Sequence, residues 1–184
     1  MFKYILQKQI ESRDLNLLPN PVILFMDEYQ HYITPYDFLF LSTARSSRAG
    51  CIMMTQNISN LYAQIGGDGR VAQEKVNALL SLSNHKFFLA QNSFITNEFA
   101  SKMIGRTIHR MGGTQVPTDG LSMGSANLSD QYHYQVMPNQ FTMLKRGGKH
   151  NEGIVECYMT ATGKTFSNGT NFLKLAFEQP WYRK

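Results

Sequence analysis

The sequence predicts an α/β fold in which a parallel sheet is flanked by helices and a β-hairpin follows near the C-terminus. From the start to about residue 105, short apolar runs alternate with helical segments, which is the usual sign of a parallel sheet covered by helices. Further on, NEGIVECYMTATGKTF has the pattern of a hairpin with its turn near Thr162 and Gly163. With 184 residues and 42% hydrophobic content, the chain is long enough for one domain with a core.

The elements before residue 105 follow from their periodicity and from their start and stop signals. The second helix has the clearest start, because Thr34 can cap it, Pro35 suits its first turn and Asp37 completes a capping pattern. In chain order we expect a helix over 3–13, a strand over 22–26, a helix from residue 35 to near Gly50, a strand over 51–55, a short segment over 57–66, a helix over 71–82, a strand over 85–90 and a helix over 93–104.

Beyond residue 105 the composition changes. Residues 112–130 are rich in Gly, Ser, Thr and Asp without periodicity, so we expect a flexible loop there. MPNQFTMLKRGG predicts a short helix or turn element before the hairpin. The expected organisation is therefore a core over 1–111, the loop over 112–130, and a hairpin and tail of the same domain over 131–184.

Composition restricts the function only weakly. A net charge of +5 and a pI near 9.2 suit a polyanionic partner, but many ordinary enzymes are equally basic. Cys51 and Cys157 lie in apolar runs, where a free cysteine usually behaves as a small buried residue of a protein in a reducing compartment. The five histidines share no metal-ligand spacing. No apolar run reaches eighteen residues, so we expect a soluble chain without direct membrane insertion.

The stretch PVILFMDEYQHY places Asp27 and Glu28 directly after a buried strand. Hydrolysis of a phosphate ester needs two such carboxylates, one for the Mg²⁺ shell and one to polarise the attacking water. Neighbouring residues that leave a strand point to opposite sides, so Asp27 can serve the metal through water and Glu28 the attacking water. The alternative from these residues alone is a buried strand with a polar exit.

A nucleotide site also needs a phosphate-binding loop of the pattern G-x-x-x-x-G-K-[ST]. The only candidate is ATGKT, residues 161–165, and it fails because Tyr158 stands where the loop needs its first glycine. It also lies in the predicted hairpin and not between a strand and a helix. Gly163 and Lys164 therefore predict an ordinary turn.

The order of motifs after Asp27 carries a family resemblance. DEYQHYITPYDFLFLSTARSSRAGCIMMTQNISNLYAQIGG and KVNALLSLSNHKFFLAQNSFITNEFASKMIGRT resemble the part after Walker B of the type IV coupling proteins of conjugation. These are TraD/TraG-like members of the HerA–FtsK class of P-loop DNA translocases, and the tail FTMLKRGGKHNEGIVECYMTATGKTF is similar to the closing segment of a subgroup of them. The resemblance implies a partial RecA-like sheet.

The resemblance also implies roles for particular residues. Asp27 and Glu28 correspond to the Walker B pair, and Gln56, after Thr55, to a strand-end glutamine that contacts water and γ-phosphate. Arg45 or Arg48 corresponds to an arginine finger that reaches a neighbouring subunit, with a solvated helix C-terminus as the alternative. The candidates for a DNA-facing surface, with scattered surface charge as the alternative, are Arg106, Arg110, Lys145, Arg146 and Lys149.

Two functions are consistent with this resemblance. In the first, the chain is the C-terminal part of a coupling ATPase that uses ATP and Mg²⁺ in a hexameric ring to move DNA or a relaxase–DNA complex, at the cytoplasmic face of the bacterial inner membrane. Because the Walker A half is absent, we expect this chain to lack a cofactor and activity alone, and to need the missing P-loop half or sister subunits. In the second, it is a non-catalytic interaction or oligomerisation module.

Overall fold

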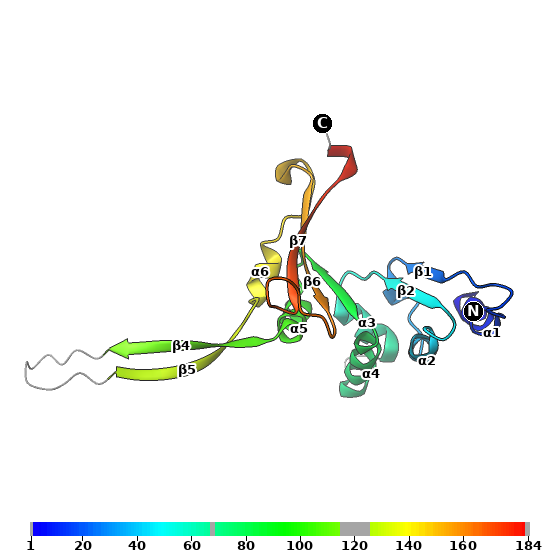
Figure 1. Cartoon of the computed structure of the whole chain (residues 1–184), viewed down its shortest axis with the longest axis horizontal. Coiled ribbons are helices and arrows are strands. Elements are labelled where there is room, and N and C mark those ends of the chain that lie inside the picture. Colours follow the sequence, from blue (N-terminus) through cyan, green and yellow to red (C-terminus); the bar gives the residue numbers. More distant parts are fainter. Residues whose placement is uncertain (1, 67–68, 115–125, 183–184) are drawn as a thin grey trace, which may run out of the picture. The chain divides into compact units, whose positions relative to one another are not determined.

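The computed structural model describes residues 2–66, 69–114 and 126–182, and the chain divides into two compact units, Met1–His85 and Lys86–Lys184 (Figure 1). This boundary differs from the predicted organisation, which placed residues 1–111 in one core. The reason lies in the third predicted strand, which neighbours a strand from the C-terminal part of the chain and neither of the two strands before it. Of the three strands predicted before residue 105, the first two pair in parallel.

The first unit follows the predicted alternation of helices and strands. Its two strands pair in parallel, with Phe25 opposite Ile52. Tyr29, Phe40 and Leu61 are among the fully buried side chains of this unit. Its elements are α1 (Phe2–Ser12), β1 (Val22–Met26), η1 (Tyr29–His31), α2 (Tyr36–Thr43), β2 (Ala49–Met53), α3 (Ile58–Gly66) and α4 (Arg70–Ser81).

Helix α2 begins and ends differently from the prediction. Only half of the capping pattern forms, because Asp37 accepts a hydrogen bond from the backbone N–H of Thr34 at 2.8 Å whereas the Thr34 hydroxyl is buried without a partner. The helix ends at Thr43 rather than near Gly50. Hydroxyl groups near its end bond to backbone carbonyls, as Ser46 does to Thr43 O at 2.7 Å, and such local bonds compete with helix continuation.

Asp37 is a buried carboxylate that joins three elements of the first unit. The residue is 1% exposed, and its carboxylate also accepts hydrogen bonds from the Tyr29 hydroxyl at 2.8 Å and the Gln7 amide at 2.9 Å. The Lys3 ammonium forms an ion pair with it. Because Lys3 and Gln7 lie on α1, Tyr29 on η1 and Asp37 on α2, this one carboxylate fixes how the three elements pack.

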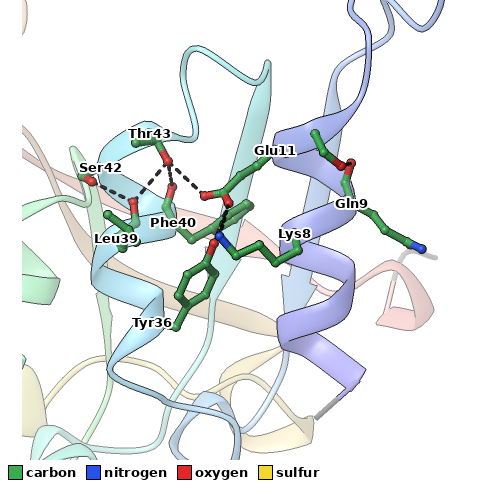
Figure 2. A network of polar contacts seen from close by, with 9 residues as sticks. Lys8, Gln9, Glu11, Tyr36, Leu39, Phe40, Ser42 and Thr43 are labelled. Carbon is green, nitrogen blue, oxygen red and sulfur yellow. Dashed lines mark hydrogen bonds and ion pairs between the residues drawn. The ribbon is translucent and has the colours of Figure 1, made fainter.

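A second polar network lies on the surface between α1 and α2 (Figure 2). The Tyr36 hydroxyl donates to Glu11, which also accepts from Thr43 at 3.2 Å and from Lys8 at 3.4 Å. The Lys8 ammonium lies 4.7 Å from the centre of the Tyr36 ring. The hydrogen bond from Tyr36 is the largest of the effects that lower the pKa of Glu11, so this carboxylate stays charged and holds the helices together.

The second unit is built on a three-stranded sheet with the order β3-β6-β7. Its core is an aromatic cluster in which the Phe141 ring lies 6.1 Å from Phe88 and 5.3 Å from Tyr158, measured between centroids. The elements are β3 (His85–Leu89), α5 (Phe94–Ile104), β4 (Arg106–Thr114), β5 (Ala126–Tyr134), α6 (Pro138–Thr142), η2 (Lys149–Asn151), β6 (Ile154–Ala161), β7 (Phe172–Glu178) and η3 (Pro180–Tyr182).

The predicted C-terminal hairpin is present, but its second strand comes later than expected. Strands β6 and β7 pair antiparallel, from Ile154 opposite Glu178 to Thr160 opposite Phe172. The turn at Gly163, where φ is +72°, directly follows β6, and residues 164–171 then precede the return strand. Gly163 therefore lies in an ordinary turn, as the sequence predicts.

Strands β4 and β5 form an antiparallel ribbon that the sequence does not predict. Arg106 pairs with Tyr134 and Thr114 with Ala126, and no other described strand pairs with this ribbon. Residues 112–114 and 126–130 of the expected loop are therefore strand, and residues 115–125 lie outside the described part of the chain. Side chains near its base, such as Tyr132, are exposed, so the apolar alternation that marks a half-buried strand is missing from the sequence.

Candidate functional site

The predicted acidic pair follows β1 at the point where the parallel strands end. Backbone hydrogen bonds continue past the strands, since Met54 N–H donates to Met26 O at 2.9 Å and Tyr29 N–H to Met54 O at 2.8 Å. Between them, Asp27 is exposed and its carboxylate accepts from the Glu28 N–H at 2.9 Å. Glu28 has φ 48° and ψ 47°, a left-handed conformation that is uncommon outside glycine and concentrates at functional sites.

The Glu28 carboxylate is held by two glutamine amides. Gln56 Nε2 donates to one of its oxygens at 2.9 Å, and Gln30 Nε2 donates to the other. The Gln30 oxygen accepts in turn from the Thr55 hydroxyl at 2.7 Å. Hydrogen bonds from Gln30 and then Gln56 lower the pKa of Glu28, because both stabilise the charged carboxylate. The predicted residues Glu28 and Gln56 thus lie together at the ends of adjacent strands.

A polar depression of about 500 Å³ opens beside this carboxylate. Gln30 is part of its wall and was missed by the sequence reasoning, because a single sequence does not show that this glutamine is buried and turned back toward Glu28. Four of the lining side chains are amides, which offer both donors and acceptors to a polar ligand. The lining residues are Glu28, Gln30, His31, Gln56, Asn60, Ala63 and Gln64.

The two predicted arginine-finger candidates differ in their surroundings. Both lie in the turn between α2 and β2 and are exposed. Arg48, with φ 48°, donates to the Pro19 carbonyl at 2.9 Å, so its guanidinium binds the segment that leads into β1. The finger role of Arg45 remains a prediction, and the contact to Pro19 makes Arg48 the weaker candidate.

Arg13, at the end of α1, joins the segments that lead into both parallel strands. Its guanidinium donates to Asn20 O at 2.8 Å, to Ser47 O at 2.5 Å and to Arg48 O at 3.1 Å. The Val22 N–H also donates to Arg48 O at 3.0 Å. Arg13 therefore links the residues that precede β1 to the residues that precede β2.

The basic candidates lie in the second unit, in two groups. On the ribbon, Arg106 lies 4.5 Å from the centre of the Tyr134 ring and Arg110 pairs with Asp130 at 3.3 Å. The other group precedes β6 and includes Arg146, which donates to Asn92 at 2.7 Å. Asp130 offsets the charge of Arg110, whereas the neutral partners of Arg106 and Arg146 occupy part of their hydrogen-bonding or stacking surface. Lys145 and Lys149, in the second group, are exposed.

Other classes of site have little support in the part of the chain that is described. No three His, Cys, Asp or Glu side chains there gather as metal ligands. Cys51 is partly buried and Cys157 buried, and burial raises the pKa of the Cys51 thiol to about 11, so this thiol is a poor nucleophile. No helix among the described residues is long and apolar enough to cross a membrane.

Comparison with solved structures first identifies the fold. The chain has the fold of the bacterial conjugative coupling protein TrwBdeltaN70 in its unbound monoclinic form, with a TM-score of 0.67 and 16% sequence identity over 95% of this chain and 35% of that one. It therefore spans about a third of the length of the coupling protein that it matches. The α/β fold predicted from the sequence is confirmed.

The sequence then identifies the family. Residues 21–140 match the family described as the TraM recognition site of TraD and TraG, and the chain belongs to that family. The match confirms the resemblance drawn from the motifs that follow Asp27. A search of curated protein sequences found no match.

Proposed function

We propose that this chain is the part of a conjugative coupling ATPase that supplies the water-activating end of the hydrolytic site. The observation that carries the proposal is the hydrogen bond between Gln56 and Glu28, which joins the ends of two adjacent parallel strands. Glu28 follows β1 and Gln56 follows β2, as the resemblance to the coupling proteins implies. In a complete coupling ATPase, hydrolysis would drive the movement of DNA or of a relaxase–DNA complex, as the sequence resemblance implies.

The residues present fit one half of a site for ATP and Mg²⁺. Asp27 offers an exposed carboxylate suited to a hydrated Mg²⁺ ion, which would neutralise phosphate charge when bound. Glu28 has a lowered pKa and is therefore charged at neutral pH, so it can accept a hydrogen bond from a water molecule and orient it. The pattern of a phosphate-binding loop does not occur in the 184 residues, and we propose that sister subunits or a P-loop half supply that function.

Reconstitution tests this proposal. The chain is joined to, or mixed with, the P-loop half of a coupling protein, and release of phosphate from ATP is measured with and without Mg²⁺. We expect hydrolysis that disappears with Glu28→Gln and persists with Glu74→Gln, a matched change at an exposed carboxylate on α4. A folded, assembled complex without hydrolysis would overturn the proposal.

The second candidate function is a non-catalytic interaction or oligomerisation module. It is favoured by the face of the parallel pair that carries Ile23, Phe25 and Ile52, of which Phe25 is 69% exposed. Parallel sheets are normally covered on both faces, so an exposed apolar face of this kind suits a protein partner. The family description names TraM recognition, and we propose a TraM-type protein as that partner.

Sedimentation distinguishes this function from the first. The chain is analysed over a range of concentrations, first alone and then mixed with the TraM-type protein of the same conjugation system. We expect a complex that Phe25→Ser weakens and that Glu28→Gln leaves unchanged. Binding unaffected by Phe25→Ser would remove this face from the proposal.

For the complete protein we propose a location at the cytoplasmic face of the bacterial inner membrane, and for the basic side chains a contact with DNA. All five candidate side chains are exposed, and the partners of the three arginines make Lys145 and Lys149 the better candidates. Arg106, Arg110 and Arg146 already have partners within the chain.

A further inference from the structure

We propose that His109 and His133 form a binding site for a transition-metal ion such as Zn²⁺, which joins strands β4 and β5 of the ribbon. The site lies in the second unit and goes beyond the proposed function, since neither histidine belongs to the carboxylate site of the first unit. The two residues lie far apart in the sequence, so their spacing gives no sign of a shared ligand.

The register of the ribbon places the two imidazoles on one face. His109 is directly opposite Gln131 and His133 directly opposite Thr107, so the two histidines are diagonal neighbours on adjacent strands. Side chains two positions apart on a strand share a face, and diagonal neighbours are within reach of aromatic rings. The two ring centres lie 5.5 Å apart, with an angle of 83° between the ring planes.

This separation suits two ligands of one metal ion. An imidazole nitrogen lies about 1.2 Å from the centre of its ring, and zinc lies about 2.0–2.1 Å from the nitrogen that binds it. For two rings whose centres are 5.5 Å apart, the two bonds would then meet at the metal at an angle of about 115°. Zinc in proteins prefers tetrahedral coordination, for which the ideal angle is about 109°. The two strands therefore already hold the rings at a suitable distance.

His133 has a nitrogen that no group of the described chain satisfies. Its Nε2 atom is buried and has no hydrogen-bond partner. Buried polar atoms are normally paired, and an imidazole nitrogen without a proton offers a lone pair to a metal ion. His109 is exposed, so its ring can turn a nitrogen toward the same point. A metal ion between the rings would give Nε2 the partner that it lacks.

The ligands and their surroundings select the class of metal ion. Imidazole suits Zn²⁺, Ni²⁺ and Cu²⁺, whereas Mg²⁺ and Ca²⁺ prefer oxygen. The nearest guanidinium in the sequence, that of Arg110, is paired with Asp130 at 3.3 Å, which offsets its repulsion of a cation. Two protein ligands leave two tetrahedral positions for water. The ion would cross-link a ribbon that pairs with no other described strand.

Zinc titration of the whole chain, without nucleotide, tests this inference. The imidazole signals in ¹H–¹⁵N NMR spectra are followed as ZnCl₂ is added, with MgCl₂ as the control ion. We expect zinc, and not magnesium, to move the His109 and His133 signals together. The signals of His150, an exposed histidine of η2 in the same unit, should stay in place.

Substitutions assign the ligands. Since loss of one outer-shell partner typically lowers metal affinity by about 10- to 100-fold, His109→Gln and His133→Gln should each weaken zinc binding by at least about tenfold. His150→Gln is the matched control and should bind zinc as the unaltered chain does. His109→Cys should keep zinc binding because a thiolate is also a zinc ligand, and a loss equal to that of His109→Gln would reject His109 as a ligand.

Hydrogen exchange tests whether the metal joins the strands. Zinc should slow the exchange of backbone amides in β4 and β5 of the unaltered chain and leave it unchanged in His133→Gln. Unmoved signals of His109 and His133, or equal zinc affinity of His109→Gln and the unaltered chain, would overturn the inference. A zinc-dependent dimer in sedimentation would also overturn it, since the metal would then link two chains instead of two strands. Because no nucleotide and no P-loop half takes part, failure of the reconstitution would leave this result unchanged.

Discussion

Replacing Asp37 by alanine should destabilise the first unit selectively. The change removes a carboxylate that is 1% exposed and accepts from four donors, so it leaves the Tyr29 hydroxyl, the Gln7 amide and the Thr34 N–H without their partner. Breaking a buried ion pair from one side costs about 3–5 kcal/mol. Lys3 is 15% exposed and can reach water, so we expect the lower part of that range, about 3 kcal/mol.

Asp37→Asn should lower the stability of the first unit by less than Asp37→Ala does. The amide oxygen can take the position of Oδ2, which accepts from Lys3, Tyr29 and Thr34. The amide nitrogen would then face Gln7, whose own oxygen is buried without a partner and can accept after a rotation of that side chain. The remaining loss is the ion pair with Lys3, for which we expect about 1–2 kcal/mol.

The assay is urea unfolding with one probe in each unit. The Tyr29 amide signal in NMR reports on the first unit, and fluorescence of Trp181, the only tryptophan, reports on the second. We expect Asp37→Ala to lower the unfolding midpoint seen at Tyr29 while the Trp181 transition stays in place. A loss below about 1 kcal/mol for Asp37→Ala, or an equal loss for Asp37→Asn, would refute this account of the buried network.

Three further predictions concern the surface network, the second core and the basic group. The pKa of Glu11 is lowered in the folded state, so its contribution to stability is present above the pKa of the unfolded state and is lost as the pH falls through the pKa of the folded state. Tyr36→Phe should therefore move acid unfolding to higher pH, which circular dichroism can follow. Phe141→Ala should cost the second unit about 3–5 kcal/mol in urea unfolding followed by Trp181, whereas Met143→Ala, at an exposed position, should change it by less than about 0.5 kcal/mol. Lys149→Ala should weaken DNA binding measured by fluorescence anisotropy and reduce its salt slope by about one, and an unchanged slope would exclude a phosphate contact.

Much of the fold could be predicted because local signals and final structure agree. Strand β1 has the predicted bounds, and α4, β3 and α5 lie within one residue of prediction at each end, since apolar periodicity and the stop at Gly105 act locally. Pairing between distant segments was not predictable in the same way. The position of β3 beside β6 depends on a strand about seventy residues later, and one sequence gives no sign of it.

The candidate site also combines residues that local patterns indicate with residues that only the folded structure brings together. Glu28 and Gln56 were selected by motif order, and the structure brings them together because both leave the ends of paired strands. Gln30 and Thr55 gain their importance from burial and from a side-chain hydrogen bond across 25 positions, which no local pattern encodes. The reconstitution with Glu28→Gln tests the catalytic role of this site.

The two parallel strands each contain five residues, and Arg13 fixes their starts to each other. Since the rise per residue is the same in both strands, any error in alignment at the start is carried unchanged to the end. An insertion or deletion in β1 or β2 would therefore move Glu28 away from Gln56 by a full residue and turn its side chain to the other face. Apolar residues in these strands can exchange for one another more freely than the strands can change length. Homologous chains with altered strand lengths should accordingly show the same change in both strands.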